Sequence, residues 1–285
     1  MEIRQVSVIG SGTMGRGIAY VCALAGYLTV LNDIEQSYLD TAREQIEQWF
    51  ARGIEKGKLT EPDASAARER LRYEPSLEPA VAEADLIIEA IPEDLTLKKD
   101  LLSQADVFCG DHTLLASNTS SLSISELAGA VERRDQFIGL HFFNPVPVMQ
   151  LLEIVVGERT SRETIEQART FAARLGKEAI VVRDSPGFAT SRLGIALGLE
   201  AIRMLEEEVG SAEDIDRAME LGYNHPMGPL RLTDLVGLDV RLRIAEYLAS
   251  KLGDRFEPPA LLRRMVEEGK LGKKSGKGFY DWTGR

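Results

Sequence analysis

Short runs of apolar residues recur along the N-terminal part of the chain and alternate with longer amphipathic segments. The runs are of strand length and lie at residues 6–9, 28–31, 85–90, 114–116, 137–140, 151–156 and 179–182. Between them, the spacing of apolar residues predicts helices at residues 14–25, 34–52, 97–108 and 162–175. Such alternation is typical of βαβ units, and nearly continuous apolar strands fit a sheet covered on both faces. The pattern therefore predicts a doubly wound, mostly parallel sheet of the α/β class.

The pattern changes near Pro186-Gly187, and no convincing strand follows until the tail. Helical spacing predicts helices at residues 188–207, 212–221, 230–252 and 258–268. Ser211 is a good N-cap residue, and Asp214 three residues later approximates a capping box. The sequence thus predicts an α/β domain over residues 1–184 and an all-helical domain over residues 185–285. A length of 285 residues fits two domains of about 150 residues each.

A glycine-rich turn joins the first predicted strand to the first predicted helix, with the sequence Gly10-Ser11-Gly12-Thr13-Met14-Gly15. The G-x-G-x-x-G pattern is common, and its place between a strand and a helix gives it weight. The first glycine permits the tight turn, the second lets the backbone approach a pyrophosphate, and the third lets helix and strand pack closely. Free N–H groups at the helix N-terminus can bind the phosphates without a lysine. The pattern predicts a Rossmann-type dinucleotide site at Gly10, Gly12, Thr13, Met14 and Gly15, with a plain strand-to-helix turn as the alternative.

Asp33 ends the second predicted strand, eighteen residues after Gly15. A carboxylate at this place accepts hydrogen bonds from ribose hydroxyls and repels the 2′-phosphate of NADP. Because Ile34 and Glu35 follow and no arginine stands beside Asp33 in the sequence, we expect NAD rather than NADP. The competing interpretation is that Asp33 is the N-cap of the next helix, and one residue can serve both purposes.

His141 stands at the end of an apolar strand, in the segment His141-Phe142-Phe143-Asn144-Pro145. Ligands of open α/β sheets bind at the carboxyl ends of strands, where a histidine near a nicotinamide is a natural general base for an alcohol. Glu153 is embedded in the next apolar strand, and a buried carboxylate needs a partner. A bond to His141 would supply that partner, fix the histidine tautomer and stabilise an imidazolium. The alternative is a histidine that is merely satisfied within the core.

Short polar residues follow another apolar strand, in the segment Ser117-Asn118-Thr119-Ser120-Ser121. Their hydroxyl and amide groups can hydrogen-bond a carbonyl or hydroxyl of a ligand. The alternative is a loop that caps a helix starting near Ser123. Ser120 is not expected to be a nucleophile, because the chain has no G-x-S-x-G elbow around it.

Charge and composition exclude several classes of protein. Lys and Arg total 34 against 45 Asp and Glu, and a net charge of −11 disfavours general binding to nucleic acid or an anionic membrane. Hydrophobic residues make up 44% of the chain, yet no stretch approaches the roughly 20 apolar residues that span a bilayer. The N-terminus does not have the pattern of a signal peptide, and Cys22 and Cys109 are too few for a disulfide framework or a metal site. We therefore expect a cytoplasmic protein without a bound metal.

Several of these segments can be taken together as a set of motifs: Gly10 to Gly15, Glu89-Ala90-Ile91-Pro92-Glu93, Ser117 to Leu122, His141 to Pro147, Pro226-Met227-Gly228-Pro229 and Gly272 to Tyr280. The set resembles the 3-hydroxyacyl-CoA dehydrogenase family almost end to end, and is most similar to its short bacterial 3-hydroxybutyryl-CoA dehydrogenase type. The resemblance implies NAD-dependent, reversible oxidation of an L-3-hydroxyacyl-CoA to the 3-ketoacyl-CoA. It also implies a homodimer formed by the helical domain.

By position, the resemblance assigns roles to individual residues. His141 would be the general base with Glu153 as its partner, and Ser120 would hydrogen-bond the substrate oxygen. Cofactor contacts would come from Glu93, Lys98, Asn118, Ser120, Asn144 and Lys274. Phosphates of CoA would meet the basic residues Arg52, Lys56 and Lys58, for which a solvated helix face is an equally simple interpretation.

Ser191 is a departure from the family pattern. The family has an asparagine that contacts the substrate after the Pro-Gly-Phe turn, and here the matching segment is Pro186-Gly187-Phe188-Ala189-Thr190-Ser191. Serine still donates a hydrogen bond, but with a reach shorter by roughly one bond, which a water could bridge. The departure bears on substrate preference more than on reaction type. Two other functions stay open: a dehydrogenase of a free hydroxy or sugar acid, and a catalytically silent NAD-binding relative.

Overall fold

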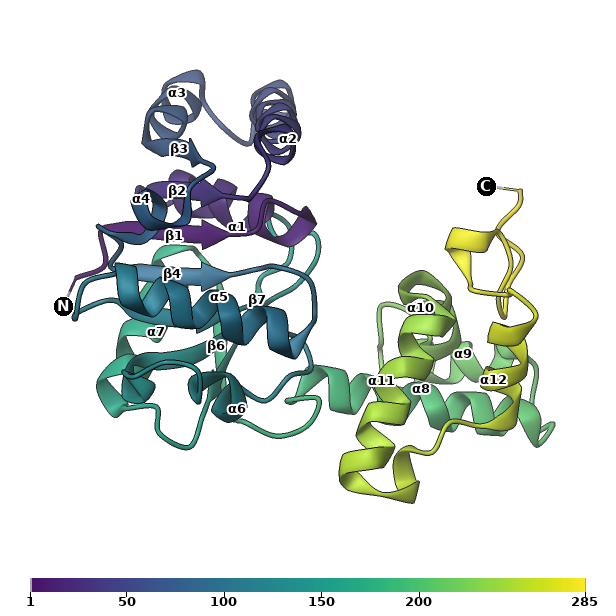
Figure 1. The fold of residues 1–285 in the computed structure, drawn as a ribbon. Coiled ribbons are helices and arrows are strands. Elements are labelled where there is room, and N and C mark those ends of the chain that lie inside the picture. The colour runs from purple at the N-terminus through teal and green to yellow at the C-terminus, as the bar shows by residue number, and fades with distance from the viewer. Residues whose placement is uncertain (1, 285) are drawn as a thin grey trace. The chain divides into compact units, whose positions relative to one another are not determined.

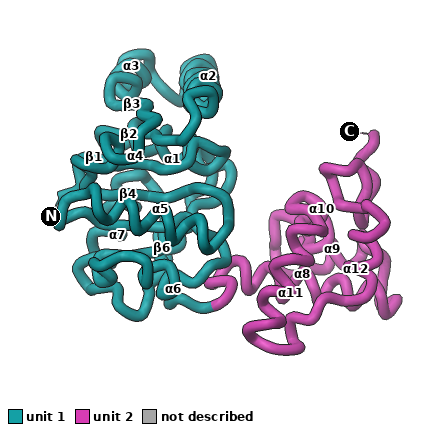
Figure 2. The backbone as a smooth tube through the Cα atoms, viewed as in Figure 1, with its two compact units in different colours: residues 1–185 teal, residues 186–285 magenta. Residues whose placement is uncertain are grey.

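The computed structural model describes residues 2–284, and the chain divides into two compact units, residues 1–185 and residues 186–285 (Figure 2). The first unit contains an eight-stranded sheet with helices on both faces, and the described part of the second is helical (Figure 1). This architecture confirms the predicted fold class, a Rossmann-type α/β sheet followed by a helical domain. No helix among residues 2–284 is both long and apolar enough to cross a membrane.

The sheet has the strand order β3-β2-β1-β4-β5-β6-β7-β8. Its strands are β1 (Gln5–Ile9), β2 (Leu28–Asn32), β3 (Leu71–Glu74), β4 (Leu86–Glu89), β5 (Leu114–Ser117), β6 (Phe137–Phe142), β7 (Leu151–Val156) and β8 (Glu178–Arg183). All neighbours pair in parallel except β6 and β7, which are antiparallel. The chain runs from β1 outward through β2 to β3 and then crosses to β4 on the other side of β1. The strand order therefore reverses between β1 and β4, and such a switch point is where sheets of this kind bind ligands.

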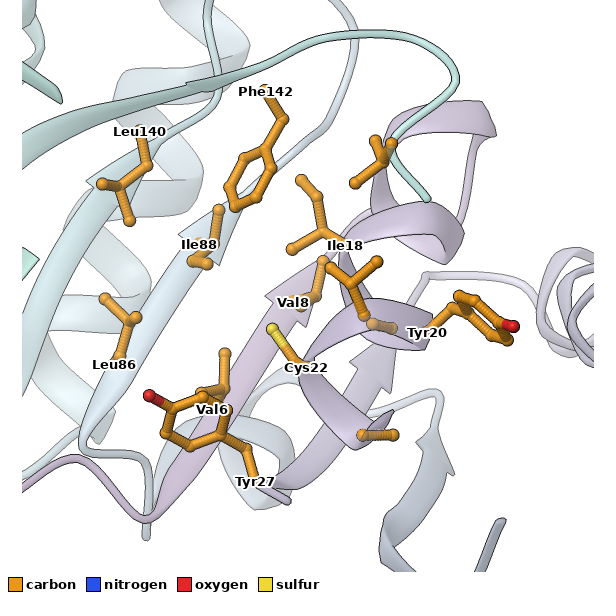
Figure 3. Close-up of a cluster of buried hydrophobic side chains, with 14 of the residues drawn as sticks. Val6, Val8, Ile18, Tyr20, Cys22, Tyr27, Leu86, Ile88, Leu140 and Phe142 are labelled. Atoms are coloured by element: carbon orange, nitrogen blue, oxygen red, sulfur yellow. The ribbon is translucent and has the colours of Figure 1, made fainter. Parts of the chain in front are cut away.

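The helices of the first unit are α1 (Thr13–Leu24), α2 (Gln36–Glu55), α3 (Glu61–Arg70), α4 (Leu77–Val81), α5 (Leu95–Phe108), α6 (Ile124–Ala128) and α7 (Arg162–Arg174). Val6, Val8 and Ile88 of the central strands pack against Ile18 and Cys22 of α1 in one apolar cluster (Figure 3). α7 joins the same cluster, and α5 covers the opposite face of the sheet (Figure 1). The buried strands thus hold the carboxyl ends of β1, β4, β5 and β6 at one edge.

The second unit contains α8 (Thr190–Glu206), α9 (Ala212–Gly222), α10 (Pro229–Val236), α11 (Leu238–Leu252) and α12 (Ala260–Glu267). As predicted, Ser211 caps a helix, and its hydroxyl accepts a 3.1 Å hydrogen bond from the Asp214 N–H. The single helix predicted over residues 230–252 is wrong. It is divided at Gly237, whose φ of +104° does not belong to an α-helix and favours glycine.

The tail of the second unit is fastened by one buried carboxylate. Asp234 is fully buried and accepts hydrogen bonds from the N–H groups of Phe279 and Tyr280, both at 2.9 Å. It also accepts a 2.8 Å bond from the Trp282 indole N–H. These three bonds satisfy the buried charge and fix the segment that carries Lys274.

Candidate active site

The glycine-rich loop between β1 and α1 requires glycine at its first and third positions and leaves open space at its second. Gly10 has a φ of +99°, and a Cβ added to it would lie 2.8 Å from the carbonyl oxygen of Ala90. A Cβ on Gly15 would lie 1.7 Å from the carbonyl oxygen of Gly10. A Cβ on Gly12 would meet nothing within 4 Å. The protein itself therefore requires glycine at the first and third positions, whereas the space above the second is open to a ligand.

A cavity of about 820 Å³ lies beside this loop at the switch point of the sheet. Its walls come from the loop and first turn of α1, the end of β2, the start of α2, the segment after β4 and the outer face of α5. The first-turn N–H groups of α1 receive no side-chain cap, so they are available to an anion. The shape, the open glycine and the helix N-terminus together fit a dinucleotide.

Asp33 lines this cavity and also holds the loop. Its Oδ2 accepts hydrogen bonds from the backbone N–H and the hydroxyl of Ser11, both at 2.7 Å, and its Oδ1 accepts one from the Ile34 N–H at 2.9 Å. The alternative role as helix N-cap is wrong, because α2 begins after Glu35. Asp33 instead couples the end of β2 to the glycine-rich loop.

Arg16 is a cavity residue that sequence reasoning missed. It stands in the first turns of α1, where side chains lean toward the helix N-terminus, and its guanidinium Nη2 lies 3.4 Å from the Thr13 hydroxyl. Its Nε is buried without a hydrogen-bond partner among the described residues. Arg16 is distant from Asp33 along the chain, and it reaches the same cavity from the helix that follows the loop.

His141 and Glu153 lie directly opposite each other on β6 and β7. His141 Nδ1 is 2.7 Å from Glu153 Oε2, and the two side chains are 8% and 0% exposed. The ring of Phe143 stands 4.4 Å from the imidazole ring, centroid to centroid. The antiparallel register explains the contact, because facing residues of adjacent strands bring their side chains within bonding distance.

A second cavity, of about 370 Å³, opens in front of His141. Its lining comes from the carboxyl ends of the central strands and comprises Met14, Ala90, Ile91, Glu93, Lys98, Asn118, Ser120, His141, Phe142, Phe143 and Asn144. Met14, Ala90 and Ile91 line the first cavity as well, so the two adjoin. The structure thus brings the imidazole and most of the expected cofactor residues of the first unit to two adjoining cavities.

Glu93 organises the polar loop after β5. Its Oε1 accepts hydrogen bonds from the Thr119 hydroxyl at 2.6 Å, from the Ser120 N–H at 3.0 Å and from the Ser121 hydroxyl at 2.9 Å. Burial opposes its charge, but Lys98 and these hydrogen bonds outweigh burial and lower the pKa of Glu93. The carboxylate therefore stays ionised and presents Ser120 to the second cavity.

Behind this loop, Lys98 and Glu89 form a buried ion pair. The Lys98 ammonium donates to both carboxylate oxygens of Glu89, at 2.9 and 2.7 Å, and to the Ile91 carbonyl at 3.1 Å. The Ser117 hydroxyl also donates to Glu89. Burial raises the pKa of Glu89, and the lysine opposes this shift. The pair fixes the ends of β4 and β5 around the cavity, while Asn118 accepts the Phe142 N–H at 2.9 Å and so ties β5 to the end of β6.

The other residues expected from the resemblance lie outside these cavities. Arg52 lies in the last turn of α2, and Lys56 and Lys58 follow the helix; all three are exposed. Ser191 is the second residue of α8 and is half-buried within the second unit. Lys274, also of the second unit, pairs with Asp239 at 2.5 Å. Among residues 2–284, no group of three or more His, Cys, Asp and Glu side chains is arranged to hold a metal ion.

Comparison with known proteins covers both units. A family model described as 3-hydroxyacyl-CoA dehydrogenase, NAD binding domain, matches residues 5–185, and one described as the C-terminal domain of the same enzyme matches residues 187–282. A probable 3-hydroxybutyryl-CoA dehydrogenase of Bacillus subtilis is 44% identical over 283 residues, which cover 99% of this chain and 98% of the relative. A 3-hydroxybutyryl-CoA dehydrogenase of Bradyrhizobium diazoefficiens is 42% identical over 283 residues, which cover 99% of this chain and 96% of the relative.

Solved structures give the same picture. The crystal structure of (S)-3-hydroxybutyryl-CoA dehydrogenase from Ralstonia eutropha superposes with a TM-score of 0.95 at 42% identity, covering 99% of both chains. A diketoreductase that acts on dicarbonyl compounds superposes with a TM-score of 0.85 at 31% identity, also covering 99% of both chains. With its two units matched and its relatives similar over their full length, the chain belongs to the 3-hydroxyacyl-CoA dehydrogenase family of NAD-dependent oxidoreductases.

Proposed function

We propose that this enzyme reversibly oxidises an L-3-hydroxyacyl-CoA, such as the 3-hydroxybutyryl-CoA of its named relatives, to the 3-ketoacyl-CoA, with His141 as the general base. The observation that carries the proposal is the His141–Glu153 pair, 2.7 Å apart, at a cavity that adjoins the glycine-rich loop. A base and a dinucleotide site side by side are what removal of a proton and a hydride from one alcohol requires.

The Glu153 carboxylate orients the His141 imidazole and stabilises its charged form. With its proton on Nδ1, the imidazole of His141 would donate to Glu153, and its Nε2 would carry the lone pair. Nε2 takes the proton of the 3-hydroxyl while the hydride leaves C3. As the imidazolium forms, its attraction to the buried carboxylate grows. Glu153 therefore stabilises the transition state more than the ground state, which lowers the barrier. In the reverse direction the same imidazolium returns its proton to the ketone oxygen.

The first unit holds the residues that would bind NAD, which when bound supplies the hydride acceptor. Gly12 and the α1 N-terminus would contact the pyrophosphate, and Asp33 the adenosine ribose. Glu93, Lys98, Asn118 and Asn144 would surround the nicotinamide end, since all four line the cavity of His141. Ser120 lines the same cavity and would hydrogen-bond the substrate oxygen.

The remaining site residues serve the thioester. The exposed Arg52, Lys56 and Lys58 would meet the phosphates of CoA, because they gather cations on one segment of an acidic chain. From the second unit, Ser191 would contact the acyl group and Lys274 the cofactor. A cytoplasmic homodimer completes the proposal: Leu221 and Tyr223, 74% and 76% exposed, give the helical unit an apolar surface suited to a second copy.

The test is turnover of the purified chain, followed by NADH absorbance with acetoacetyl-CoA and with free acetoacetate. The proposal predicts reduction of the thioester with a kcat/KM far above that of the free acid. A higher kcat/KM for free acetoacetate would favour a dehydrogenase of a free hydroxy or sugar acid, an alternative that the similarity to a diketoreductase also raises. Absence of turnover with both substrates would favour a catalytically silent NAD-binding protein. The same assay with NADPH tests Asp33: Asp33→Ala should raise NADPH use relative to NADH.

A further inference from the structure

Helix α11 carries an arginine in its core-facing stripe. The buried residues of this helix are Leu238, Arg241, Ala245 and Leu248, a spacing of three and four that turns one face toward the interior of the helical unit. Three of the four are apolar, as such a stripe requires. Arg241 occupies a position where the pattern calls for a residue without charge.

Among residues 186–284, no carboxylate forms an ion pair with the guanidinium of Arg241. The residue is only 8% exposed, and its Nε is buried without a hydrogen-bond partner. No ion pair or hydrogen bond joins its side chain to another described residue of the helical unit, 186–284. Burial lowers the pKa of Arg241 to about 10, which still leaves the group charged at neutral pH. A buried cation is costly unless an anion joins it, so the position is explained best by a ligand.

The arginine abuts the helix that begins the second unit. Its Nη1 is 3.3 Å from the point where a Cβ of Gly194, a residue of α8, would stand. Gly194 follows Ser191 by three residues, so the two share a face of α8. Glycine inside a helix is unfavourable, and serine is shorter than the asparagine of the family pattern. The turn of α8 beside the guanidinium is therefore lined by two small residues, one of which can donate a hydrogen bond.

We propose that Arg241 and Ser191 form an anion subsite that takes a carboxylate at the far end of the acyl chain, so that the preferred substrates are 3-hydroxyacyl-CoA thioesters of dicarboxylic acids. This inference rests on the proposed function, which assigns the Ser191 position to the acyl group. A guanidinium binds a carboxylate through two parallel hydrogen bonds, and the serine hydroxyl adds a third donor. An unsubstituted acyl chain would leave the same charge buried and unpaired.

The experiment compares two thioesters of equal chain length, 3-hydroxyhexanoyl-CoA and its ω-carboxylate analogue 3-hydroxyadipyl-CoA. The wild type should have the higher kcat/KM with the ω-carboxylate. Arg241→Met, which removes the charge and keeps an apolar side chain in the stripe, should lower that preference by about 10- to 100-fold, the scale of hydrogen bonds to a charged group. Arg241→Lys should keep part of the preference for the ω-carboxylate thioester, because it keeps the positive charge. Arg243→Met, on the exposed face of the same helix, is the control with the same charge change and should keep the wild-type preference.

Each other result counts against the subsite. A wild type that prefers the unsubstituted chain, or an Arg241→Lys or Arg241→Met enzyme with an unchanged ratio, overturns the inference while the proposed function stands. Conversion of a dimer to monomers by Arg241→Met with an unchanged ratio would assign the arginine to a partner subunit's carboxylate. Absence of turnover with both thioesters would instead overturn the proposed function itself, and the subsite with it.

Discussion

Replacement of Glu153 by glutamine tests whether the buried carboxylate acts through its charge. The amide has almost the shape of the carboxylate and can still accept the Nδ1–H of His141 through its oxygen. The strand register that places the two residues opposite each other depends on backbone bonds and is retained. Glu153→Gln therefore removes one negative charge from the side of the imidazole and changes little else.

The expected loss follows from the geometry. An N···O distance of 2.7 Å places the centres of charge of an imidazolium and a carboxylate about 4 Å apart, where an effective dielectric constant of about 20 gives an attraction of about 4 kcal/mol. Both side chains are buried, so solvent screens little of it. If most of this attraction is present in the transition state, kcat should fall about 10³-fold.

The assay is NADH oxidation with acetoacetyl-CoA, together with the Kd of NADH measured by fluorescence. Glu153→Gln should lower kcat and leave the Kd of NADH within about twofold of wild type, because Glu153 is not among the residues that line either cavity. Glu158→Gln, on an exposed residue after the same strand, is the control and should keep full activity. A kcat within threefold of wild type in Glu153→Gln would refute the electrostatic role.

Three further predictions concern the cofactor cavity. Gly12→Ala should lower the free energy of unfolding by about 1 kcal/mol or less, yet weaken NADH binding at least tenfold. Gly15→Ala should instead lower the melting temperature, because its Cβ would lie 1.7 Å from the Gly10 carbonyl oxygen. Arg16→Gln should raise the Kd of NADH and of ADP but not that of adenosine; equal losses for all three would contradict a phosphate contact. Since the pKa of Glu93 is lowered on folding, its contribution to stability is present above pH 4.5 and is lost as the pH falls below that value. In denaturant titrations, the free energy of unfolding of Glu93→Gln should fall less between neutral and acid pH than that of wild type. An equal fall in both proteins would exclude Glu93 as a source of the pH dependence.

The strands were the most predictable part of the fold, because buried parallel strands appear in the sequence as apolar runs. β3 (Leu71–Glu74) was missed: it is a short edge strand in which Arg72 and Glu74 interrupt the apolar pattern. The division between α10 and α11 was missed as well, since apolar spacing continues on both sides of Gly237 and only the backbone angle separates the helices.

The site could be predicted wherever residues stand at strand ends. The sequence predicts the pair of His141 and Glu153, because a carboxylate in an apolar strand needs a partner on a neighbouring strand. Arg16 and Arg241 could not be found in this way. Their significance depends on which face of a helix they occupy and on a guanidinium Nε that is buried without a hydrogen-bond partner among residues 2–284. Sequence spacing alone shows only the helix face.

The central claim is that the His141 imidazole removes the substrate proton, and the turnover number of His141→Ala measures this most directly. With acetoacetyl-CoA and NADH, the variant should lose about 10²- to 10⁴-fold in kcat while its Kd for NADH stays close to that of wild type. Its melting temperature should fall, because the buried Glu153 loses the imidazole that it contacts. A folded, NADH-binding variant that turns over at a near-normal rate would contradict the claim.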